Sequence, residues 1–321
     1  MRRVLSTPQL TDTAEVESGA NDPFSTVIGN KPVSNALRTA IAGARAEART
    51  LGHILFTGPS GVGKTHFAKM VAESVGATMT RIHGPSITRR NVNDIMRALL
   101  TLSDRDVLFV DEIHALPLEG MECLYQAMEE SQVSIPTPEP IDPTAGSGPA
   151  FITVSLSAFT LIGATTKPGS LSEPLRTRFT RTLQLQPYTH EELALILGED
   201  ERGASMLDAS ERMAIASRSR GRARRALHLM SVCLDHRLIG HTIDDAFREM
   251  GVGVHGDLPD DRVYVNALRG ALRGGPSGLD AIVAVTGLDK LQVELDIEPF
   301  LISLGVIQRT PRGRILSGDL T

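Results

Sequence analysis

The stretch HILFTGPSGVGKTHFAKMVAESVG, residues 53–76, decides the fold of this chain of 321 residues. Residues 53–57 form a short apolar run that ends at a glycine, which predicts a buried strand. Residues 65–75 follow a helical pattern that Gly76 closes. The loop between them, residues 58–65, matches the phosphate-binding pattern G-x-x-x-x-G-K-[ST], and the strand and helix beside it disfavour a chance glycine-rich turn.

The residue types of this loop suit a nucleoside triphosphate. Gly58, Gly61 and Gly63 allow the backbone to curl so that successive N–H groups face the phosphates, and the helix N-terminus adds positive potential there. Lys64 would reach the β- and γ-phosphates, and the Thr65 hydroxyl would bind Mg²⁺. The expected cofactors are therefore ATP and Mg²⁺.

A second cluster lies at residues 107–114, where four apolar residues precede two acids in the run VLFVDEIH. A buried strand would deliver Asp111 at its carboxyl end, where ligands bind in open α/β sheets. Asp111 would then hold Mg²⁺, and Glu112 would polarise the water that attacks the γ-phosphate. The alternative, an acidic surface turn after a strand, is disfavoured by the phosphate loop upstream. His114 fits a packed or solvent-facing histidine as well as a functional one.

The rest of the first half alternates strands with helices. Residues 159–164 predict a third buried strand, and the alternating runs at 132–135 and 151–156 flank a proline-rich segment at 136–149, which predicts a β-hairpin with a long tip. Strands that alternate with helices predict a parallel sheet covered on both faces. The helical patterns of this part lie at 33–48, 92–102 and 119–130.

The chain divides into four parts by composition. Residues 1–22 read as a flexible tail, and residues 23–186 contain the sheet, with the hairpin at about 132–156. Residues 187–255 are helical only and end in a linker rich in glycine, aspartate and proline at 251–261. Residues 256–321 contain a third compact unit of short helices that ends in a hairpin.

Composition sets broad limits on function. Lys and Arg total 33 against 38 Asp and Glu, so the net charge is −5 and any nucleic-acid contact must come from a local basic patch. Two cysteines, Cys123 and Cys233, exclude a disulfide framework and fit a reducing compartment. No apolar run approaches the roughly 18 residues of a membrane helix. We therefore expect a cytoplasmic protein with no membrane contact.

With these motifs in view, the chain resembles the AAA+ ATPases and, more narrowly, the RuvB family, the ring motors that drive branch migration of Holliday junctions. The ATPase motifs are shared by many AAA+ proteins, whereas IQRTPRGR at 307–314, with GGPSGLD at 274–280 ahead of it, is far more specific. The resemblance implies a mixed α/β fold: an AAA+ P-loop parallel-sheet domain, a small all-α lid domain and a C-terminal winged-helix domain. The matching segments run over nearly the whole chain after Pro23: GPSGVGKTHFA (58–68), DVLFVDEIHAL (106–116), LYQAMEE (124–130), FTLIGATTKPGSLSEPLRTRF (159–179), YTHEEL (188–193), SRSRG (217–221), GGPSGLD (274–280) and EPFLISLGVIQRTPRGR (298–314).

The resemblance also implies residues around the nucleotide. Val27 and Ile28 would line the adenine pocket, and Tyr188 matches a family nucleotide contact. His66 keeps a backbone N–H for the α-phosphate. Thr166 occupies the position of the residue that senses the γ-phosphate, at the tip of the third strand.

Further residues would act between subunits or between domains. Arg178 matches the arginine finger that reaches the ATP of a neighbouring subunit, and Glu129 and Glu130 match nucleotide-site positions near that interface. Arg224 matches the second sensor on the helical lid. Its segment, residues 217–225, has five arginines, for most of which a solvated face is an equally good interpretation.

The terminal hairpin carries the resemblance to a DNA-binding turn. Arg309, Arg312 and Arg314 match the DNA contacts of a winged helix, with Pro311 and Gly313 shaping the turn. Such a turn can follow phosphates without reading sequence. The alternative is an ordinary exposed hairpin.

The resemblance implies an ATP-dependent DNA helicase that drives branch migration at four-way junctions as a hexameric ring, in recombination and repair. A clamp- or helicase-loader ATPase, or a nucleotide-gated DNA-binding module, is the alternative, and neither explains all the motifs. In the family the hairpin docks on the junction-binding partner RuvA. Because its tip here is longer, proline-rich and acidic, a divergent RuvA, another adaptor or no adaptor remain open.

Overall fold

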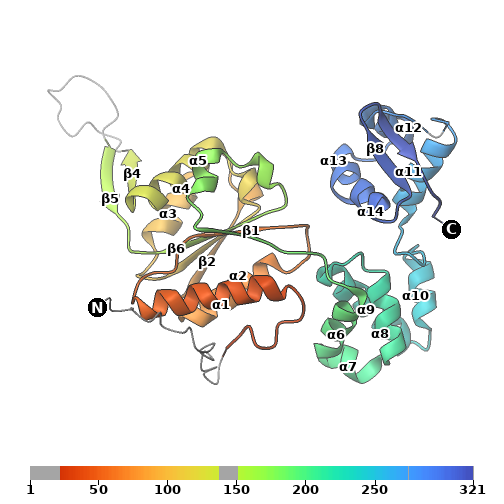
Figure 1. Cartoon of the computed structure of the whole chain (residues 1–321), viewed down its shortest axis with the longest axis horizontal. Helices are drawn as coiled ribbons and strands as arrows, with labels where there is room; N and C mark the ends of the chain where they lie inside the picture. Colours follow the sequence, from red (N-terminus) through yellow and green to blue (C-terminus); the bar gives the residue numbers. More distant parts are fainter. Residues whose placement is uncertain (1–21, 137–150, 274, 321) are drawn as a thin grey trace, which may run out of the picture.

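The computed structural model describes residues 22–136, 151–273 and 275–320. Figure 1 shows three bodies along the chain: a sheet with helices on both sides, a helical bundle, and a C-terminal unit of helices with a hairpin. The predicted α/β class is confirmed. The tail predicted over 1–22, apart from Asp22, and the predicted hairpin tip lie outside the described residues.

A five-stranded sheet forms the first body, with the strand order β2-β3-β6-β1-β7 and parallel pairing throughout. The three strands predicted from apolar runs are its centre, and they are buried along almost their whole length. Because the strands are parallel, their carboxyl ends meet at one edge of the sheet. The strands are β1 (Ile54–Thr57), β2 (Met79–His83), β3 (Val107–Asp111), β6 (Thr160–Thr165) and β7 (Arg181–Gln184).

The two edge strands, β2 and β7, were not predicted from the sequence. Their sequences are MTRIH and RTLQ, and only Ile82 among these residues is fully buried. An edge strand pairs on one side only and carries polar side chains, so it lacks the continuous apolar run that marks a central strand.

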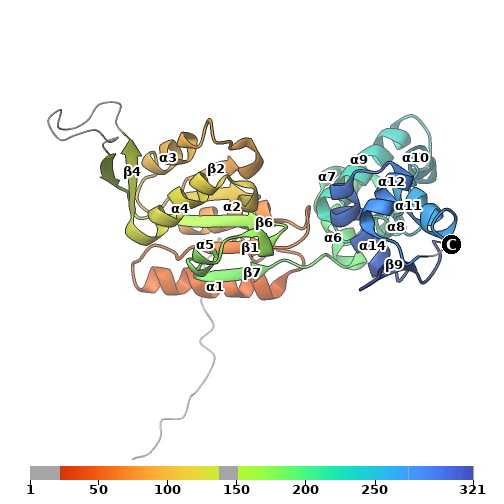
Figure 2. The ribbon, with the colours of Figure 1, turned by 90° about the horizontal axis from the view of Figure 1, so that it is seen from above.

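Alternate residues of the central strands face opposite layers of helices. Phe109 packs with Phe67 in one core, while its neighbours Leu108 and Val110 pack with Leu124 in the other. In Figures 1 and 2, α1 and α2 cover one face of the sheet, and α3, α4 and α5 lie on the opposite side. These helices are α1 (Lys31–Ala46), α2 (Lys64–Val75), α3 (Asn93–Leu100), α4 (Leu118–Glu130) and α5 (Glu173–Thr177), with short 3₁₀ turns at Gly84–Ser86, Ile113–Ala115 and Pro168–Ser170.

The two alternating runs after α4 pair as an antiparallel hairpin, β4 (Gln132–Pro136) with β5 (Phe151–Ser155). In Figure 1 the hairpin projects from the sheet body at the end away from the helical bundle. Val133 anchors its base in the core, whereas Phe151 and Ile152 on β5 are 55% and 49% exposed. The hairpin therefore presents apolar side chains outward.

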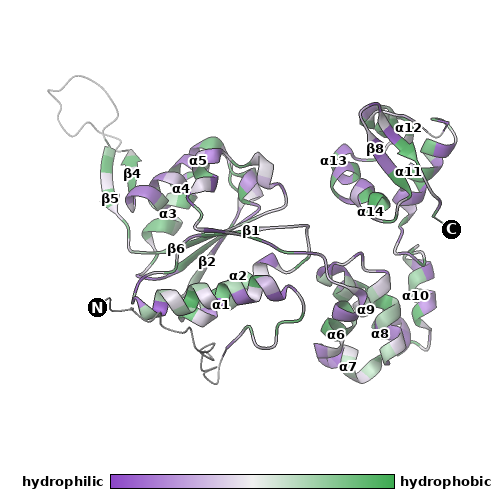
Figure 3. Cartoon of the chain, in the orientation of Figure 1, coloured by the Kyte–Doolittle hydropathy of each residue, from purple (hydrophilic) through white to green (hydrophobic). Residues whose placement is uncertain are grey.

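Five helices build the bundle between Thr189 and Met250. Capping boxes begin three of them, at Thr189, Asp208 and Thr242, where the side chain of each capping residue accepts a backbone N–H of the first turn. Figure 3 shows hydrophilic and hydrophobic residues on the same helices, as expected for helices that cover a core on one side. The helices are α6 (His190–Glu199), α7 (Glu201–Met206), α8 (Ala209–Ser217), α9 (Ala223–Leu238) and α10 (Ile243–Glu249).

The C-terminal unit has its own core, which includes Tyr264, Ile282 and Leu301. The predicted linker at 251–261 is too long: Pro259 begins α11, because proline suits the first helical turn and Asp260 and Asp261 complement the helix dipole there. Helices followed by a two-stranded wing form the winged-helix arrangement. The elements are α11 (Pro259–Arg269), α12 (Leu279–Thr286), α13 (Lys290–Gln292), a π-helical turn (Val293–Ile297), α14 (Glu298–Ser303), β8 (Ile307–Thr310) and β9 (Gly313–Leu316).

Within the ranges that the structure covers, none of the helices combines the length and the apolar character needed to cross a bilayer.

A partly buried histidine makes the sheet body sensitive to acid. The Nδ1 atom of His53 accepts the Leu161 amide N–H at 2.8 Å, and burial lowers the pKa of His53 to about 4. In the unfolded chain the His53 imidazole takes up a proton near pH 6.5, whereas in the folded chain it does so only near pH 4. Protonation therefore favours the unfolded chain, and the free energy of unfolding falls as the pH drops from 6.5 towards 4.

We expect His53→Asn, which keeps an acceptor for that amide, to lose less stability than the unsubstituted protein on acidification. The difference should be about 2 kcal/mol at pH 5 relative to pH 7.5, measured by urea unfolding at both values. His228→Asn, at an exposed position of α9, is the matched control. Equal losses of unfolding free energy on acidification in all three proteins would show that His53 is not the source of the acid sensitivity.

Candidate nucleotide-hydrolysis site

The phosphate loop leaves β1 at Thr57 and enters α2 at Lys64. Its three glycines adopt left-handed backbone conformations, with φ of 138° at Gly58, 81° at Gly61 and 99° at Gly63. A Cβ atom at Gly58 would lie 2.4 Å from the carbonyl oxygen of Leu185, so a side chain has no room there. The glycines are thus required by the curl of the loop.

Lys64 is enclosed by this loop. Lys64 is only 6% exposed. Its ammonium donates hydrogen bonds to the carbonyls of Gly58 and Pro59, both at 2.8 Å. Burial lowers the pKa of Lys64, while the charges of Glu112 and Asp111 raise it. The two acids therefore lie near the ammonium, and a curled backbone around a cation fits a triphosphate chain.

Asp111 ends β3 and Glu112 turns the chain out of the sheet with a left-handed φ of 49°. The Glu112 Oε2 atom accepts the Thr166 backbone N–H at 3.1 Å and the Thr166 hydroxyl at 3.0 Å. The predicted base and the predicted phosphate sensor are thus in direct contact, although they are 54 residues apart in the sequence.

His114 lies beside the same group. Its Nδ1 atom lies 2.9 Å from the Thr165 hydroxyl and 3.3 Å from Glu112 Oε2. Burial lowers the pKa of His114, and the nearby Glu112 opposes that shift. His114 therefore bonds the Thr165 hydroxyl beside Glu112, and Glu112 Oε1 has no hydrogen-bond partner among the described residues.

Sequence reasoning missed Arg81 on β2. Its Nη2 atom lies 2.6 Å from Asp111 Oδ2, and its guanidinium lies 5.8 Å from the centre of the Phe109 ring. Only the alternation of MTRIH beside a neighbouring strand could have placed Arg81 there, and that pattern is too short to identify a strand.

The oxygen atoms expected to hold a divalent cation are of the correct chemical type. Thr65 offers a hydroxyl at the start of α2, and Asp111 offers a carboxylate at the end of β3, at the same edge of the sheet. Hard oxygen ligands of this kind, completed by phosphate oxygens and waters, are those that Mg²⁺ takes in nucleotide sites. The residues present therefore fit Mg²⁺.

The predicted adenine side is built around Tyr188. A Cβ atom at Gly29 would lie 2.8 Å from the Tyr188 ring, and one at Gly63 would lie 3.0 Å from its hydroxyl, so the ring packs against both segments. Val27 is buried and Ile28 is half-buried beside Gly29. The structure thus brings the residue 27–29 segment, Tyr188 and the phosphate loop together. His66 is exposed in the first turn of α2.

The helical bundle touches the phosphate loop through its arginine segment. The Arg224 backbone N–H donates to the Gly61 carbonyl at 3.3 Å, and a Cβ atom at Gly61 would lie 3.3 Å from the Cβ of Arg224 and 3.5 Å from that of Arg222. The Arg224 side chain is exposed and its guanidinium has no hydrogen-bond partner within the described ranges. It is free to meet a phosphate.

Two neighbouring arginines bind the C-terminal unit instead. Arg220 is buried with Asp261, its Nε atom donates to the Gly256 carbonyl at 2.9 Å, and its guanidinium lies 3.7 Å from the Phe300 ring centre. Arg222 forms an ion pair with Asp296. For Arg220 and Arg222, the interpretation as a solvated face is therefore wrong.

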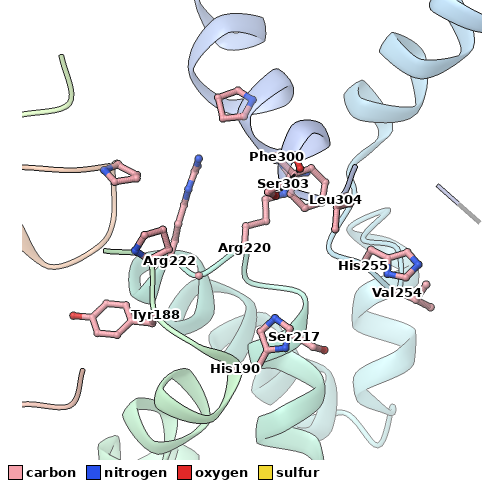
Figure 4. A pocket seen from close by; sticks show the side chains of 14 residues that line it. Tyr188, His190, Ser217, Arg220, Arg222, Val254, His255, Phe300, Ser303 and Leu304 are labelled. Carbon is pink, nitrogen blue, oxygen red and sulfur yellow. Dashed lines mark hydrogen bonds between the residues drawn. The ribbon is translucent and has the colours of Figure 1, made fainter. Parts of the chain in front are cut away.

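A cavity of about 440 Å³ lies where these parts meet. Figure 4 shows Arg220 reaching towards Phe300, whereas Arg222 extends away from Tyr188. Pro59 of the phosphate loop also lines this cavity. The nucleotide loop, the bundle and the C-terminal unit therefore border one space.

Arg178 lies at the end of α5 and is held by α4. Its Nε atom is 2.6 Å from Glu129 Oε2, its Nη2 donates to the Tyr125 hydroxyl at 3.2 Å, and its guanidinium lies 5.2 Å from the Tyr125 ring centre. Glu130 instead accepts a hydrogen bond from Gln126 at 3.3 Å. No hydrogen bond or ion pair joins Arg178 to residues 58–65 in the described part of the chain.

In the wing, two of the three predicted DNA-binding arginines are engaged by a fully buried acid. Glu298 accepts hydrogen bonds from Arg309 at 2.7 Å, Arg314 at 2.8 Å and the Tyr264 hydroxyl at 2.9 Å. Burial raises the pKa of Glu298, but these hydrogen bonds outweigh burial and hold the pKa below its ordinary value. Arg312, at the turn, is exposed and has no ion-pair partner among the described residues.

Comparisons with known proteins agree on one family. A family model of the Holliday junction DNA helicase RuvB P-loop domain matches residues 21–185, and one of the RuvB C-terminal winged helix domain matches residues 257–319. The Holliday junction branch migration complex subunit RuvB of Synechococcus sp. (strain RCC307) is 37% identical over 300 residues, which cover 90% of this chain and 84% of that protein. The Kosmotoga olearia protein of the same name is 35% identical over 298 residues, with 90% and 84% covered.

Solved structures lead to the same family. The structure described as the Thermotoga maritima RuvB Holliday junction branch migration motor has a TM-score of 0.75 at 32% identity, covering 90% of this chain and 92% of that chain. A mutant of the same protein reaches a TM-score of 0.79 at 31% identity, covering 92% and 95%. The resemblance found in the sequence is confirmed, and the chain belongs to the RuvB family.

Proposed function

We propose that this protein hydrolyses ATP and uses the energy to drive branch migration of Holliday junctions as a ring of identical subunits. The observation that carries the hydrolysis is the contact of Glu112 with Thr166 close to the enclosed Lys64. Membership in the RuvB family supports the four-way DNA junction as substrate.

Each group of the site has a distinct part in hydrolysis. Lys64 and the N–H groups of the loop bind the phosphates, and Thr65 and Asp111 hold the cation. Mg²⁺, when bound, neutralises charge that develops on the β- and γ-phosphate oxygens. Glu112 orients the attacking water through Oε1, because Oε2 already accepts the N–H and the hydroxyl of Thr166.

A shared active site explains the position of Arg178. Glu129 and Tyr125 hold its guanidinium on the surface formed by α4 and α5, without a polar contact to its own phosphate loop within the described residues. We propose that Arg178 completes the site of the adjacent subunit, which makes hydrolysis depend on a closed ring. A hexamer is the ring size that the family resemblance implies.

Coupling from ATP to DNA passes through the helical bundle. The Arg224 backbone N–H contacts the phosphate loop at the Gly61 carbonyl, and the nearby Arg222 pairs with Asp296 of the winged-helix unit. The buried pair of Arg220 with Asp261 fixes the bundle to that unit. A rotation of the bundle that follows nucleotide binding would therefore carry the DNA-binding unit with it.

The wing of the C-terminal unit would contact the DNA backbone. Arg312 extends at the turn between β8 and β9, whereas Arg309 and Arg314 shape that turn through Glu298. Phosphate contacts of this kind bind without reading sequence, as a motor that moves along DNA requires.

The hairpin is the proposed docking element for a RuvA-type partner. Phe151 and Ile152 expose apolar surface on β5, which suits a protein contact. We also propose a cytoplasmic location, because a motor that moves DNA junctions acts where the DNA is. No described contact favours the loader alternative, which leaves the wing unexplained.

The first test is strand exchange on a synthetic four-way junction with ATP and Mg²⁺, with and without a RuvA-type partner. We expect the unsubstituted protein to dissociate the junction, and Glu112→Gln to bind ATP but turn it over at least about 10²-fold more slowly, because the water loses its base. Glu122→Gln, at an exposed site on α4, should behave normally. Normal turnover by Glu112→Gln would contradict its role, and ATPase activity without junction movement would favour the loader alternative.

The second prediction concerns the shared site. Arg178→Ala alone should lose about 10³-fold or more of its ATPase rate, because no finger reaches the neighbouring nucleotide. Mixed with Glu112→Gln subunits, which supply an intact Arg178, it should regain part of that rate in a steady-state ATPase assay. Arg176→Ala, exposed on the same short helix, should remain active. An absence of rescue in mixed rings would rule out a finger acting between subunits.

The third prediction separates the wing arginines. Arg312→Ala should lower the slope of log K against log salt for duplex DNA by about one, with an unchanged melting temperature. Arg314→Ala should lower stability by about 1–3 kcal/mol, because Glu298 loses a buried partner. Fluorescence anisotropy at several salt concentrations and thermal unfolding measure the two effects. An unchanged salt slope for Arg312→Ala would remove it from the DNA contact.

A further inference from the structure

Arg81 contacts the proposed cation ligand from a strand that the sequence did not reveal. β2 pairs with β3 in a register that places Arg81 opposite Phe109 and His83 opposite Asp111. Because side chains alternate along a strand, Arg81 and His83 lie on the same face as Phe109 and Asp111. The Arg81 side chain extends along this face to Asp111, with 2.6 Å between Nη2 and Oδ2.

The ion pair between Arg81 and Asp111 is more buried on the Asp111 side. The Asp111 side chain is 13% exposed and that of Arg81 is 49% exposed, and the guanidinium stem passes the Phe109 ring. Within the described ranges, Arg81 is the only hydrogen-bond partner of the Asp111 carboxylate. One oxygen, Oδ2, is thereby occupied, and Oδ1 is left for a cation or its water.

The charges at the site do not favour a cation before a nucleotide arrives. Lys64 and Arg81 carry two positive charges against the two negative charges of Asp111 and Glu112, and Arg224 adds a positive charge near Lys64, so a divalent cation meets little net attraction. The phosphates of a nucleotide add negative charge at the same place, and Mg²⁺ in such sites is held by one or two carboxylates together with phosphates.

We propose that Arg81 is a positioning residue of the cation site: by pairing with Asp111 it makes divalent-cation binding depend on the nucleotide phosphates. This inference rests on the proposed hydrolysis of ATP at this site. Loss of a residue that holds a metal ligand from outside commonly costs about 10- to 100-fold in metal affinity. Arg81 differs because its own positive charge repels the metal ion, so its removal should strengthen binding by a comparable factor.

The test is Mn²⁺ binding to the full chain, followed by electron paramagnetic resonance, first without nucleotide and then with ADP. Arg81→Met keeps the apolar stem over Phe109 and removes the charge, and it should bind Mn²⁺ at least about tenfold more tightly than the unsubstituted protein without nucleotide. The strengthening of Mn²⁺ binding by ADP should shrink by the same factor. Arg81→Lys, which keeps the charge, should stay within about threefold of the unsubstituted protein.

Two control variants test whether a gain in Mn²⁺ affinity comes from the Asp111 carboxylate. Arg97→Met removes an exposed arginine of α3 that pairs with Asp94, and it should leave Mn²⁺ binding unchanged. Adding Asp111→Asn to Arg81→Met should abolish the tighter binding, because the freed carboxylate is gone. Unchanged Mn²⁺ affinity in a folded Arg81→Met protein, or a gain that survives Asp111→Asn, would overturn the inference.

The measurement is independent of the motor function. It needs neither ATP hydrolysis nor DNA, so failure here with intact strand exchange refutes only the role of Arg81. A failure of strand exchange alongside an Asp111-dependent gain in Mn²⁺ affinity refutes the motor function and leaves the role of Arg81 supported.

Discussion

The parallel pairing of β3, β6 and β1 is the constraint on which the whole site depends. Its register sets Thr57 beside Thr165 and Val110 beside Gly163, so the residues that follow these strands leave the sheet at the same edge. The phosphate loop, the two acids and Thr166 are therefore brought together by backbone hydrogen bonds in a buried sheet. A shift of one residue would displace a strand end by about 3.3 Å and separate Glu112 from Thr166.

Buried carboxylates hold several arginines in ion pairs, and an arginine held in this way is less available to bind a phosphate. Asp261 and Glu298 are almost completely buried and hold Arg220, Arg309 and Arg314. A buried ion pair recovers little net stability after desolvation, but removal of one partner is costly, so such pairs define geometry. Arg224 and Arg312 have no such partner among the described residues, and these are the two that we propose for ATP and DNA.

Gly61 is the residue of the phosphate loop that lies against the helical bundle. Its backbone lies against Arg222 and Arg224, and the absence of a side chain permits that approach. Arg222 pairs in turn with Asp296. The short segment 222–224 thus lies between the phosphate loop and the winged-helix unit, and it is the path that we propose for their coupling.

The sequence by itself determined the phosphate loop, the acid pair, the central strands and the family, because each signal lies within a few consecutive residues. It did not reveal β2 and β7, since edge strands with polar faces lack an apolar run. Only the tertiary structure decided that Arg81 binds Asp111, that Arg222 binds Asp296 and that Glu298 holds the wing. The partners of the first two pairs are 30 and 74 residues apart, and nothing local in a sequence specifies which distant carboxylate folding will bring to an arginine.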